Sequence, residues 1–145
     1  MPSATTSQEP TRREFKPYKP KKKEAYMSPA QQDHFRAILN AWRDELTEEL
    51  ERMRSRMQDE VINFPDPTDR ASQESEMALE LRTRDRERKL IIRIDKTLEQ
   101  IDEGDYGYCE ECGADIGLRR LEARPTAKQC VDCKSLAEIR EKQMG

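Results

Sequence analysis

Apolar residues in the first half of the chain repeat at helical spacing. After Ser28, large apolar side chains recur every three or four residues, about 3.6 on average, which is typical of one face of a long helix. Ser28 is a candidate N-cap, Pro29 suits the first helical position, and Gln31 can complete a capping box. The pattern predicts a nearly straight helix over 28–62, because its steps follow an eleven-residue period. The apolar face comprises Phe35, Leu39, Trp42, Leu46, Leu50, Met53, Met57, Val61 and Phe64.

A proline-rich turn separates this helix from a second one. Pro65 and Pro67 each disfavour helical geometry in the residue before them, and Asp69 is a candidate cap for a helix over 70–104. Together the two helices predict an antiparallel hairpin with arms of roughly 50 Å. The apolar seam of the second arm is sparse and comprises Ala71, Ala78, Leu81, Leu90, Ile91, Ile94, Leu98 and Ile101. Residues 82–89 have no apolar side chain, so packing there should be thin; this run either is a solvated face or contacts a partner or an anionic ligand.

Composition agrees with an elongated molecule. The chain is 34% hydrophobic and 39% charged, with a mean hydropathy of −1.10, so a thick globular core is not expected. There is no long apolar run and no signal-like segment after the first methionine, so we expect a cytoplasmic protein with no membrane segment. Residues 1–27 carry seven Lys or Arg against three Asp or Glu. They predict a flexible basic tail, which either solubilises the protein or is attracted to nucleic acid or an acidic surface.

All four cysteines lie in the last part of the chain. Cys109 and Cys112 form one C-x₂-C pair, and after seventeen residues Cys130 and Cys133 form a second. Four thiolates can surround a tetrahedral Zn²⁺ and leave no position for water, which predicts one structural zinc ion. A redox-active dithiol or an iron–sulfur cluster is the alternative, but no thioredoxin-like pattern surrounds the pairs. The fold class is therefore all-α and elongated: a flexible tail over 1–27, a coiled-coil hairpin over 28–105 with its tip at 63–69, and a C4 zinc finger with a C-terminal helix over 106–145.

Two further features each have a structural and a functional interpretation. His34 lies beside the apolar stripe at the base of the first helix, where a structural histidine is expected rather than a ligand or a catalytic base. A group of basic residues surrounds the cysteines: Arg119, Arg120, Arg124, Lys128 and Lys134. They either compensate the negative charge of a four-thiolate metal centre or bind an anion.

Several further motifs follow one another in register along the chain: Asn63-Phe64-Pro65-Asp66-Pro67-Thr68-Asp69-Arg70-Ala71, Leu81-Arg82-x-Arg84-Asp85-Arg86-Glu87-Arg88-Lys89-Leu90, Gly107-Tyr108-Cys109-x-x-Cys112-Gly113, Arg119-Arg120-Leu121-Glu122-Ala123-Arg124-Pro125-Thr126 and Ala137-Glu138-Ile139-Arg140-Glu141-Lys142-Gln143-Met144. Together with the helical hairpin, they resemble the bacterial DksA/TraR family of RNA polymerase-binding transcription factors. The resemblance covers residues 26–145 and leaves out the N-terminal tail.

The resemblance implies a monomeric regulator that binds RNA polymerase and not promoter DNA, and that is not an enzyme. Its coiled coil would enter the secondary channel and, with the alarmone ppGpp, repress rRNA and other stable-RNA promoters and activate others in the stringent response. In the family the tip acts near the active site, which maps to Asp66, Asp69 and Ala71. The ppGpp site maps to Leu90, Arg93, Arg124 and Lys134, where Arg93 replaces the usual lysine, and polymerase contacts map to Asn63 and Arg86.

Two other classes of function are compatible with the cysteine pattern. A zinc-ribbon nucleic-acid binder would associate with bare DNA in a steeply salt-dependent way, but the net charge of −3 counts against it. A thiol oxidoreductase would have reactive cysteines in a metal-free protein, and retention of zinc would exclude that role.

Overall fold

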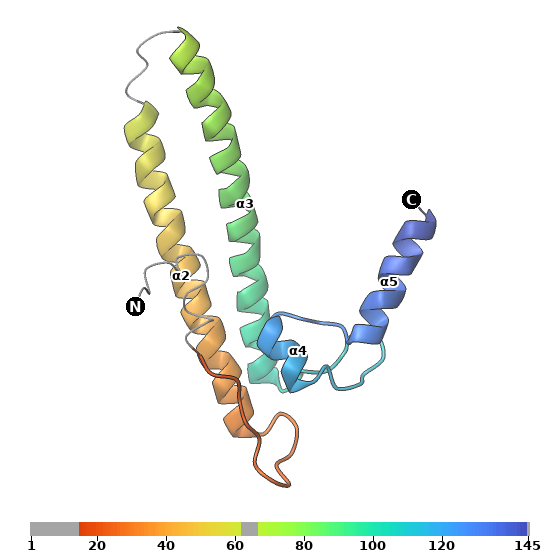
Figure 1. Cartoon of the computed structure of the whole chain (residues 1–145). Helices are drawn as coiled ribbons and strands as arrows, with labels where there is room; N and C mark the ends of the chain where they lie inside the picture. The colour runs from red at the N-terminus through yellow and green to blue at the C-terminus, as the bar shows by residue number, and fades with distance from the viewer. Residues whose placement is uncertain (1–14, 62–66, 145) are drawn as a thin grey trace.

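The chain forms an antiparallel helical hairpin with a smaller unit at its base. In the computed structural model, which describes residues 15–61 and 67–144, helix α2 (Pro29–Val61) and helix α3 (Pro67–Glu103) run side by side (Figure 1). The short helix α4 (Leu118–Ala123) lies against the base of the hairpin, and helix α5 (Val131–Met144) projects away from it. The described residues contain no strand, only an isolated bridge between Tyr108 and Asp115. The predicted all-α hairpin is confirmed.

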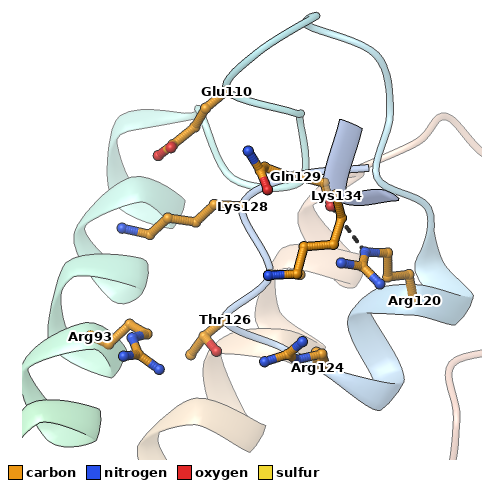
Figure 2. Close-up of a pocket in the computed structure, with 9 residues that line it drawn as sticks. Arg93, Glu110, Arg120, Arg124, Thr126, Lys128, Gln129 and Lys134 are labelled. Carbon is orange, nitrogen blue, oxygen red and sulfur yellow. Dashed lines mark hydrogen bonds between the residues drawn. The ribbon is translucent and has the colours of Figure 1, made fainter. Parts of the chain in front are cut away.

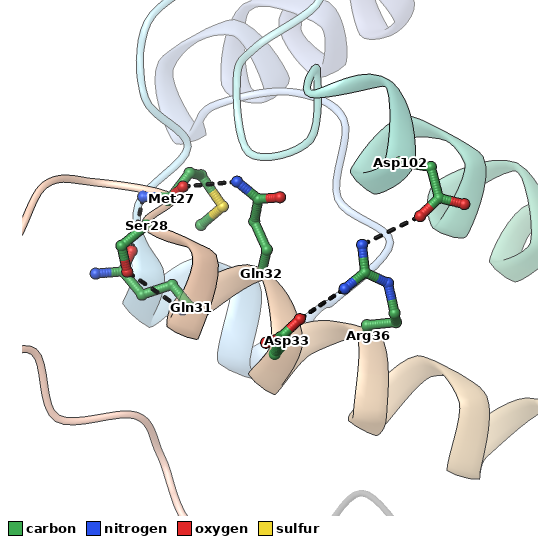
Figure 3. A network of polar contacts seen from close by, with 7 residues as sticks. All are labelled: Met27, Ser28, Gln31, Gln32, Asp33, Arg36 and Asp102. Carbon is green, nitrogen blue, oxygen red and sulfur yellow. Dashed lines mark hydrogen bonds and ion pairs between the residues drawn. The ribbon is translucent and has the colours of Figure 1, made fainter.

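The N-terminus of α2 begins at the predicted proline, with a modified capping box. The Gln31 backbone N–H donates to Ser28 Oγ at 3.3 Å, as a capping box requires. The Gln31 side chain does not return to the Ser28 N–H; its Oε1 accepts the Met27 N–H at 2.7 Å, one residue earlier (Figure 3). The buried amide of Gln31 therefore connects α2 to the segment before it.

One apolar core lies at the base and includes residues from every helix except α5. Phe35 and Leu39 on α2 are fully buried, as are Ile94 and Ile101 on α3 and Leu121 on α4. The same cluster includes residues of the predicted zinc finger as well as of the predicted hairpin. An ion pair also joins the two helices beside this core: the Arg36 guanidinium of α2 contacts Asp102 of α3 at 3.1 Å. Hairpin and finger therefore share a core rather than each having its own.

The apolar face of α2 follows the predicted stripe over the described part of the helix. Met53 and Met57 are buried like the residues at the base, and Leu46 and Leu50 are partly buried. The side chain of Val61 and all of Phe64 lie outside the described residues. In a hairpin, such a continuous stripe faces the partner helix.

The predicted seam of α3 is wrong in its distal half. Ala71 and Ala78 are exposed, and Leu81 is 49% exposed. The half-buried positions are mostly polar instead: Gln73, Met77, Glu80, Arg84 and Glu87. Long side chains can cover apolar surface with their aliphatic stems, and one Arg84 guanidinium nitrogen lies 3.9 Å from Met57 Sδ. Some of their polar atoms are buried without a partner among the described residues, which makes this half of the hairpin the weaker one.

The tip differs from the prediction in where the second helix begins. Helix α3 starts at Pro67 and not at Arg70, because proline is favoured at the first helical position. Asp69 is therefore not the N-cap; it lies within the first turn, where a carboxylate is stabilised by the helix dipole. Asn63 and Asp66 lie outside the described residues.

The segment before α2 is held in place over its described part, residues 15–27. Met27 is buried in the shared core, and Phe15 and Tyr26 pack against it. The expectation of a flexible tail is corrected for these residues, and residues 1–14 lie outside the described part of the chain. Among the described helices, none combines the length and apolarity that crossing a membrane requires.

Candidate metal centre and cationic pocket

The first cysteine pair lies in a tight turn after the hairpin. The Cys109 N–H donates to Ala114 O at 2.8 Å, and the Gly113 N–H donates back to Cys109 O at 2.9 Å. Gly113 has a φ of 77°, a backbone conformation that favours glycine. This compact turn directs Cys109 and Cys112 to the same point.

The second pair lies at the start of α5. Cys130 directly precedes the helix and Cys133 lies in its first turn. The Cys133 N–H points at Cys130 Sγ at 3.5 Å, and a helix N-terminus stabilises thiolates through its unpaired N–H groups. The second pair is therefore also held by local backbone structure, here the first turn of a helix.

The four sulfur atoms fit a tetrahedral metal ion. All of them lie within 4.8 Å of one another, and Cys112 Sγ lies 3.8 Å from Cys130 Sγ. A tetrahedron with Zn–S bonds of ~2.3 Å has edges of roughly 3.8 Å. Backbone hydrogen bonding at Cys130 and Cys112 lowers the pKa of the Cys109 thiol to about 6, which favours its thiolate at neutral pH. Four sulfur ligands leave no open position, so the site suits a structural zinc ion.

A pocket lined by positive charge lies between α3 and the finger. It is a cavity of about 290 Å³, and Figure 2 shows side chains from the two sides pointing into it. Arg93 lies on α3 at one side, with Lys128 extending toward the same side. Lys134, Arg124 and Arg120 lie on the other side. The pocket thus has two cationic walls, one of them on the hairpin.

The five cations of the pocket form no ion pair with any residue that the structure describes, although Glu110 also lines the cavity. The Arg120 Nε instead donates to the Gln129 carbonyl at 3.0 Å. Placing this much like charge around one cavity is unfavourable unless an anion occupies it. Guanidinium and ammonium groups suit phosphate oxygens, so the pocket is a candidate site for a phosphorylated ligand.

The structure brings most of the predicted ligand residues together. Arg93, Arg124 and Lys134 all line the pocket, although they come from distant parts of the chain. Leu90 does not line it; this half-buried side chain packs against the shared core one turn before Arg93. The basic cluster around the cysteines signalled Arg120 and Lys128, but only the fold places these two side chains around one cavity with Arg93.

The predicted tip residues lie at the other end of α3. Asp69 and Ala71 are exposed in the first turns of that helix. Arg86 is exposed midway along α3, where its guanidinium lies 3.5 Å from Thr83 Oγ1. These residues do not line the pocket.

His34 has a structural setting, as the sequence predicted. Its Nε2 lies 2.8 Å from Glu122 Oε2, and both side chains are largely buried. Its ring packs edge-on against Phe35, with the ring centroids 4.9 Å apart. The pair therefore joins α2 to α4 beside the shared core.

A helical hairpin that shares one core with a C4 zinc finger defines the class of protein. Residues 31–101 match the family described as DnaK suppressor protein DksA, N-terminal domain, and residues 104–138 match the prokaryotic dksA/traR C4-type zinc finger. The RNA polymerase-binding transcription factor DksA of Escherichia coli (strain K12) is 63% identical over 129 residues, which are 89% of this chain and 85% of that protein. The chain belongs to the DksA family, as the motifs predicted.

Other relatives agree with this assignment. The protein of the same name from Haemophilus influenzae is 62% identical over 130 residues, covering 90% of each chain. The solved structure of transcription factor DksA2 from Pseudomonas aeruginosa is similar with a TM-score of 0.76 and 44% identity. That match covers 81% of this chain and 91% of the other. Family members are transcription factors and not enzymes.

Proposed function

We propose that this protein is a transcription factor that binds RNA polymerase directly and inserts the tip of its hairpin into the secondary channel. The proposal rests on the long, narrow hairpin, which has the exposed carboxylate of Asp69 near one end. The chain is also 63% identical to a protein named for RNA polymerase binding. The 33 residues of α2 span roughly 50 Å at 1.5 Å per residue, enough to extend well beyond the core at the base. No catalytic group is needed for such a role.

The tip would act through its charge. Asp69 would bring a carboxylate to the end of the hairpin, with Ala71 two residues further on, and both residues are exposed. Asp66, which lies outside the described residues, would act together with Asp69. A site organised around Mg²⁺ and basic residues is sensitive to negative charge placed within a few ångströms. Asn63 and Arg86 would contact polymerase along the inserted arm. These contacts would destabilise initiation complexes, repressing rRNA and other stable-RNA promoters and activating others in the stringent response.

The cationic pocket would bind the effector ppGpp at the interface with polymerase. Arg93 on the hairpin wall and Arg124 and Lys134 on the finger wall would hold the phosphates. Leu90, one turn before Arg93 on α3, would complete the site that the family resemblance implies. The absence of ion pairs around these side chains in the described structure supports an anionic ligand. Two walls of positive charge also suit a nucleotide with two separate pyrophosphate groups. Arg120 and Lys128 extend the set of ligand residues.

The remaining parts of the proposal follow from a polymerase-directed mode of action. The protein would work as a monomer in the cytoplasm and would not read promoter DNA itself. The net charge of −3 is unfavourable for binding a phosphate backbone without help from polymerase. The zinc ion would hold the finger together and take no part in chemistry.

Purified transcription at an rRNA promoter tests the role of the tip. Asp69→Asn removes one charge and keeps the size of the side chain, so inhibition should fall while binding to polymerase remains. Asp85→Asn is the matched control, because Asp85 is also an exposed carboxylate on α3 but lies away from the tip. Equal inhibition by Asp69→Asn and the parent protein would show that the assigned role of the tip is wrong.

A further inference from the structure

The segment before α2 contacts the zinc finger through one tyrosine hydroxyl. Tyr26 Oη donates to the Gly107 carbonyl at 2.6 Å and accepts the Gly117 N–H at 2.9 Å. Gly107 directly precedes the turn that carries Cys109 and Cys112, and Gly117 directly precedes α4. A single side chain therefore holds both ends of the first metal-binding loop, from a position one residue before the buried Met27.

This contact is closely packed and leaves no room for adjustment. A Cβ atom at Gly107 would lie 2.9 Å from Met27 Cγ and 3.1 Å from Tyr26 Oη, and Gly107 has a φ of 96°. The Tyr26 ring packs edge-on against Tyr108, with centroids 5.5 Å apart. Desolvation by burial raises the pKa of Tyr26, so its hydroxyl stays protonated and remains a donor. Met27 itself has a φ of 55°, which is uncommon for a residue other than glycine and is held by its surroundings.

A second anchor joins the same segment to α4. The Tyr18 N–H donates to Glu122 Oε2 at 2.8 Å, and the same oxygen contacts His34 Nε2 on α2. The Tyr18 ring lies 5.4 Å from the His34 ring. Glu122 is thus contacted both by His34 of the hairpin and by Tyr18 of the segment before α2.

The shape of the segment is fixed by its own hydrogen bonds. The Glu24 carboxylate accepts the Lys21 N–H at 2.8 Å, the Tyr18 hydroxyl at 2.7 Å and the Ser28 hydroxyl. The two anchors therefore lie on one folded piece of chain rather than on independent residues. Because residues 15–27 keep a fixed shape, they can fix the position of the finger relative to α2.

The hydrogen bonds of these two anchors restrict the angle between the finger and the hairpin, which the apolar contacts of the core do not. Apolar contacts between hairpin and finger are not directional, whereas hydrogen bonds constrain angles as well as distances. One other buried hydrogen bond in this region runs from Tyr106 Oη to Pro125 O at 2.8 Å, but both of its residues come after α3. Residues 15–27 instead connect the start of α2 to the first metal loop and to α4.

We propose that residues 15–27 set the orientation of the zinc finger on the hairpin, with Tyr26 as a positioning residue for the cationic pocket. One wall of the pocket, Arg93, belongs to the hairpin, whereas Arg124 and Lys134 belong to the finger. Because the four sulfurs converge within 4.8 Å, a shift of the first metal loop carries the start of α5 with it. The separation of the two walls therefore depends on the contact at Tyr26. The consequence for effector binding rests on the proposed function.

Tyr26→Phe is the direct test, because it deletes both hydrogen bonds of the hydroxyl and keeps the ring. Tyr108→Phe is the matched control, because its ring belongs to the same aromatic pair and the residue is 38% exposed. Spin labels would be attached through unnatural amino acids in place of Glu99 on α3 and Glu138 on α5, both exposed, because thiol labelling would attack the metal ligands. The measurement is the distribution of distances between the labels in the zinc-loaded full chain.

The expected result for Tyr26→Phe is a shifted or broader distance distribution with zinc content unchanged, while Tyr108→Phe matches the parent. An unchanged distribution in Tyr26→Phe would overturn the proposal. Glu122→Ala, which removes the Tyr18 anchor together with the His34 contact, should also widen the distribution. Effector binding is scored separately, as the ppGpp concentration giving half-maximal effect on transcription with polymerase. That concentration should rise about three- to tenfold in Tyr26→Phe, corresponding to the net loss of one or two hydrogen bonds. A changed distribution with an unchanged ppGpp response would uphold the positioning role and refute the assignment of the pocket to ppGpp.

Discussion

Truncating Ile94 should destabilise the hairpin and the zinc finger together. Its side chain is 0% exposed and belongs to the cluster that contains Phe35 of α2 and Leu121 of α4. Removing a fully buried isoleucine to alanine costs ~2–5 kcal/mol, depending on how far the surroundings can close the cavity. That is a large fraction of a total stability of ~5–15 kcal/mol. At roughly 3–4 °C per kcal/mol for a chain near this size, Ile94→Ala should lower the melting temperature by roughly 6–20 °C.

Two probes show whether one core serves both units. Loss of helical circular dichroism reports mainly on α2 and α3, whereas release of zinc to a chromogenic chelator reports on the finger. Both midpoints should move to lower temperature by the same amount in Ile94→Ala. Leu81→Ala is the control, because Leu81 lies on the same helix and is 49% exposed, and its effect should stay below about 1 kcal/mol. A shift in the helical signal without a shift in zinc release would refute the shared core, and so would an equally large effect of Leu81→Ala.

Three further predictions address the metal, pH and the pocket. Cys112→Ser should abolish stoichiometric zinc binding by native mass spectrometry and, because the finger shares its core with the hairpin, should also lower the thermal midpoint of the helical signal; a fully retained zinc ion would contradict the four-sulfur site. Hydrogen bonds from Ser28, Tyr18 and Lys21 lower the pKa of Glu24 from its ordinary value of 4.5 to about 2. This group therefore contributes stability that is fully present above about pH 4.5 and is lost as pH falls toward 2; an NMR titration of the Glu24 carboxyl that gave an ordinary pKa would exclude the fold of residues 15–27. Lys128→Ala should raise the half-maximal ppGpp concentration roughly three- to tenfold, as expected for one charge-assisted contact, whereas Lys142→Ala at the exposed end of α5 should leave it unchanged.

The sequence predicted those parts of the fold that depend on local chemistry. The start of α2 follows from Ser28 and Pro29, whose preferences act within one turn of helix. The metal site was equally predictable from the sequence, because two C-x₂-C pairs require only short local turns to bring their sulfurs together. The stripe on α2 was predictable because its residues are large and apolar along the described helix.

Long-range relations were not predictable in the same way. The distal seam of α3 was assigned to Ala78 and Leu81 because they are apolar, but half-buried Arg84 and Glu87 cover that surface with long aliphatic stems. The order of residues 15–27 depends on Tyr26 meeting Gly107, a pair 81 residues apart with no local signal. Composition alone, rich in lysine and proline, indicated a flexible tail.

The cationic pocket was predictable only in part, because it depends on both a local cluster and a long-range contact. The basic cluster near the cysteines was visible in the sequence, and so was the alternative that it only compensates the charge of the metal centre. Only the packing of the finger against α3 places Arg93 across a cavity from Arg124 and Lys134. Arg93, Arg124 and Lys134 are candidates for ligand binding because the fold brings them around one cavity.

Site-specific photo-crosslinking from the tip most directly tests whether the hairpin enters RNA polymerase. The probe is p-benzoylphenylalanine in place of Ala71, which is exposed beside Asp69, and the control places the same group at Glu141 on α5. In complexes with polymerase, the probe at position 71 should label residues lining the secondary channel near the catalytic Mg²⁺, and the probe at position 141 should label only the outer surface. Labelling of the outer surface alone from position 71 would contradict insertion of the tip.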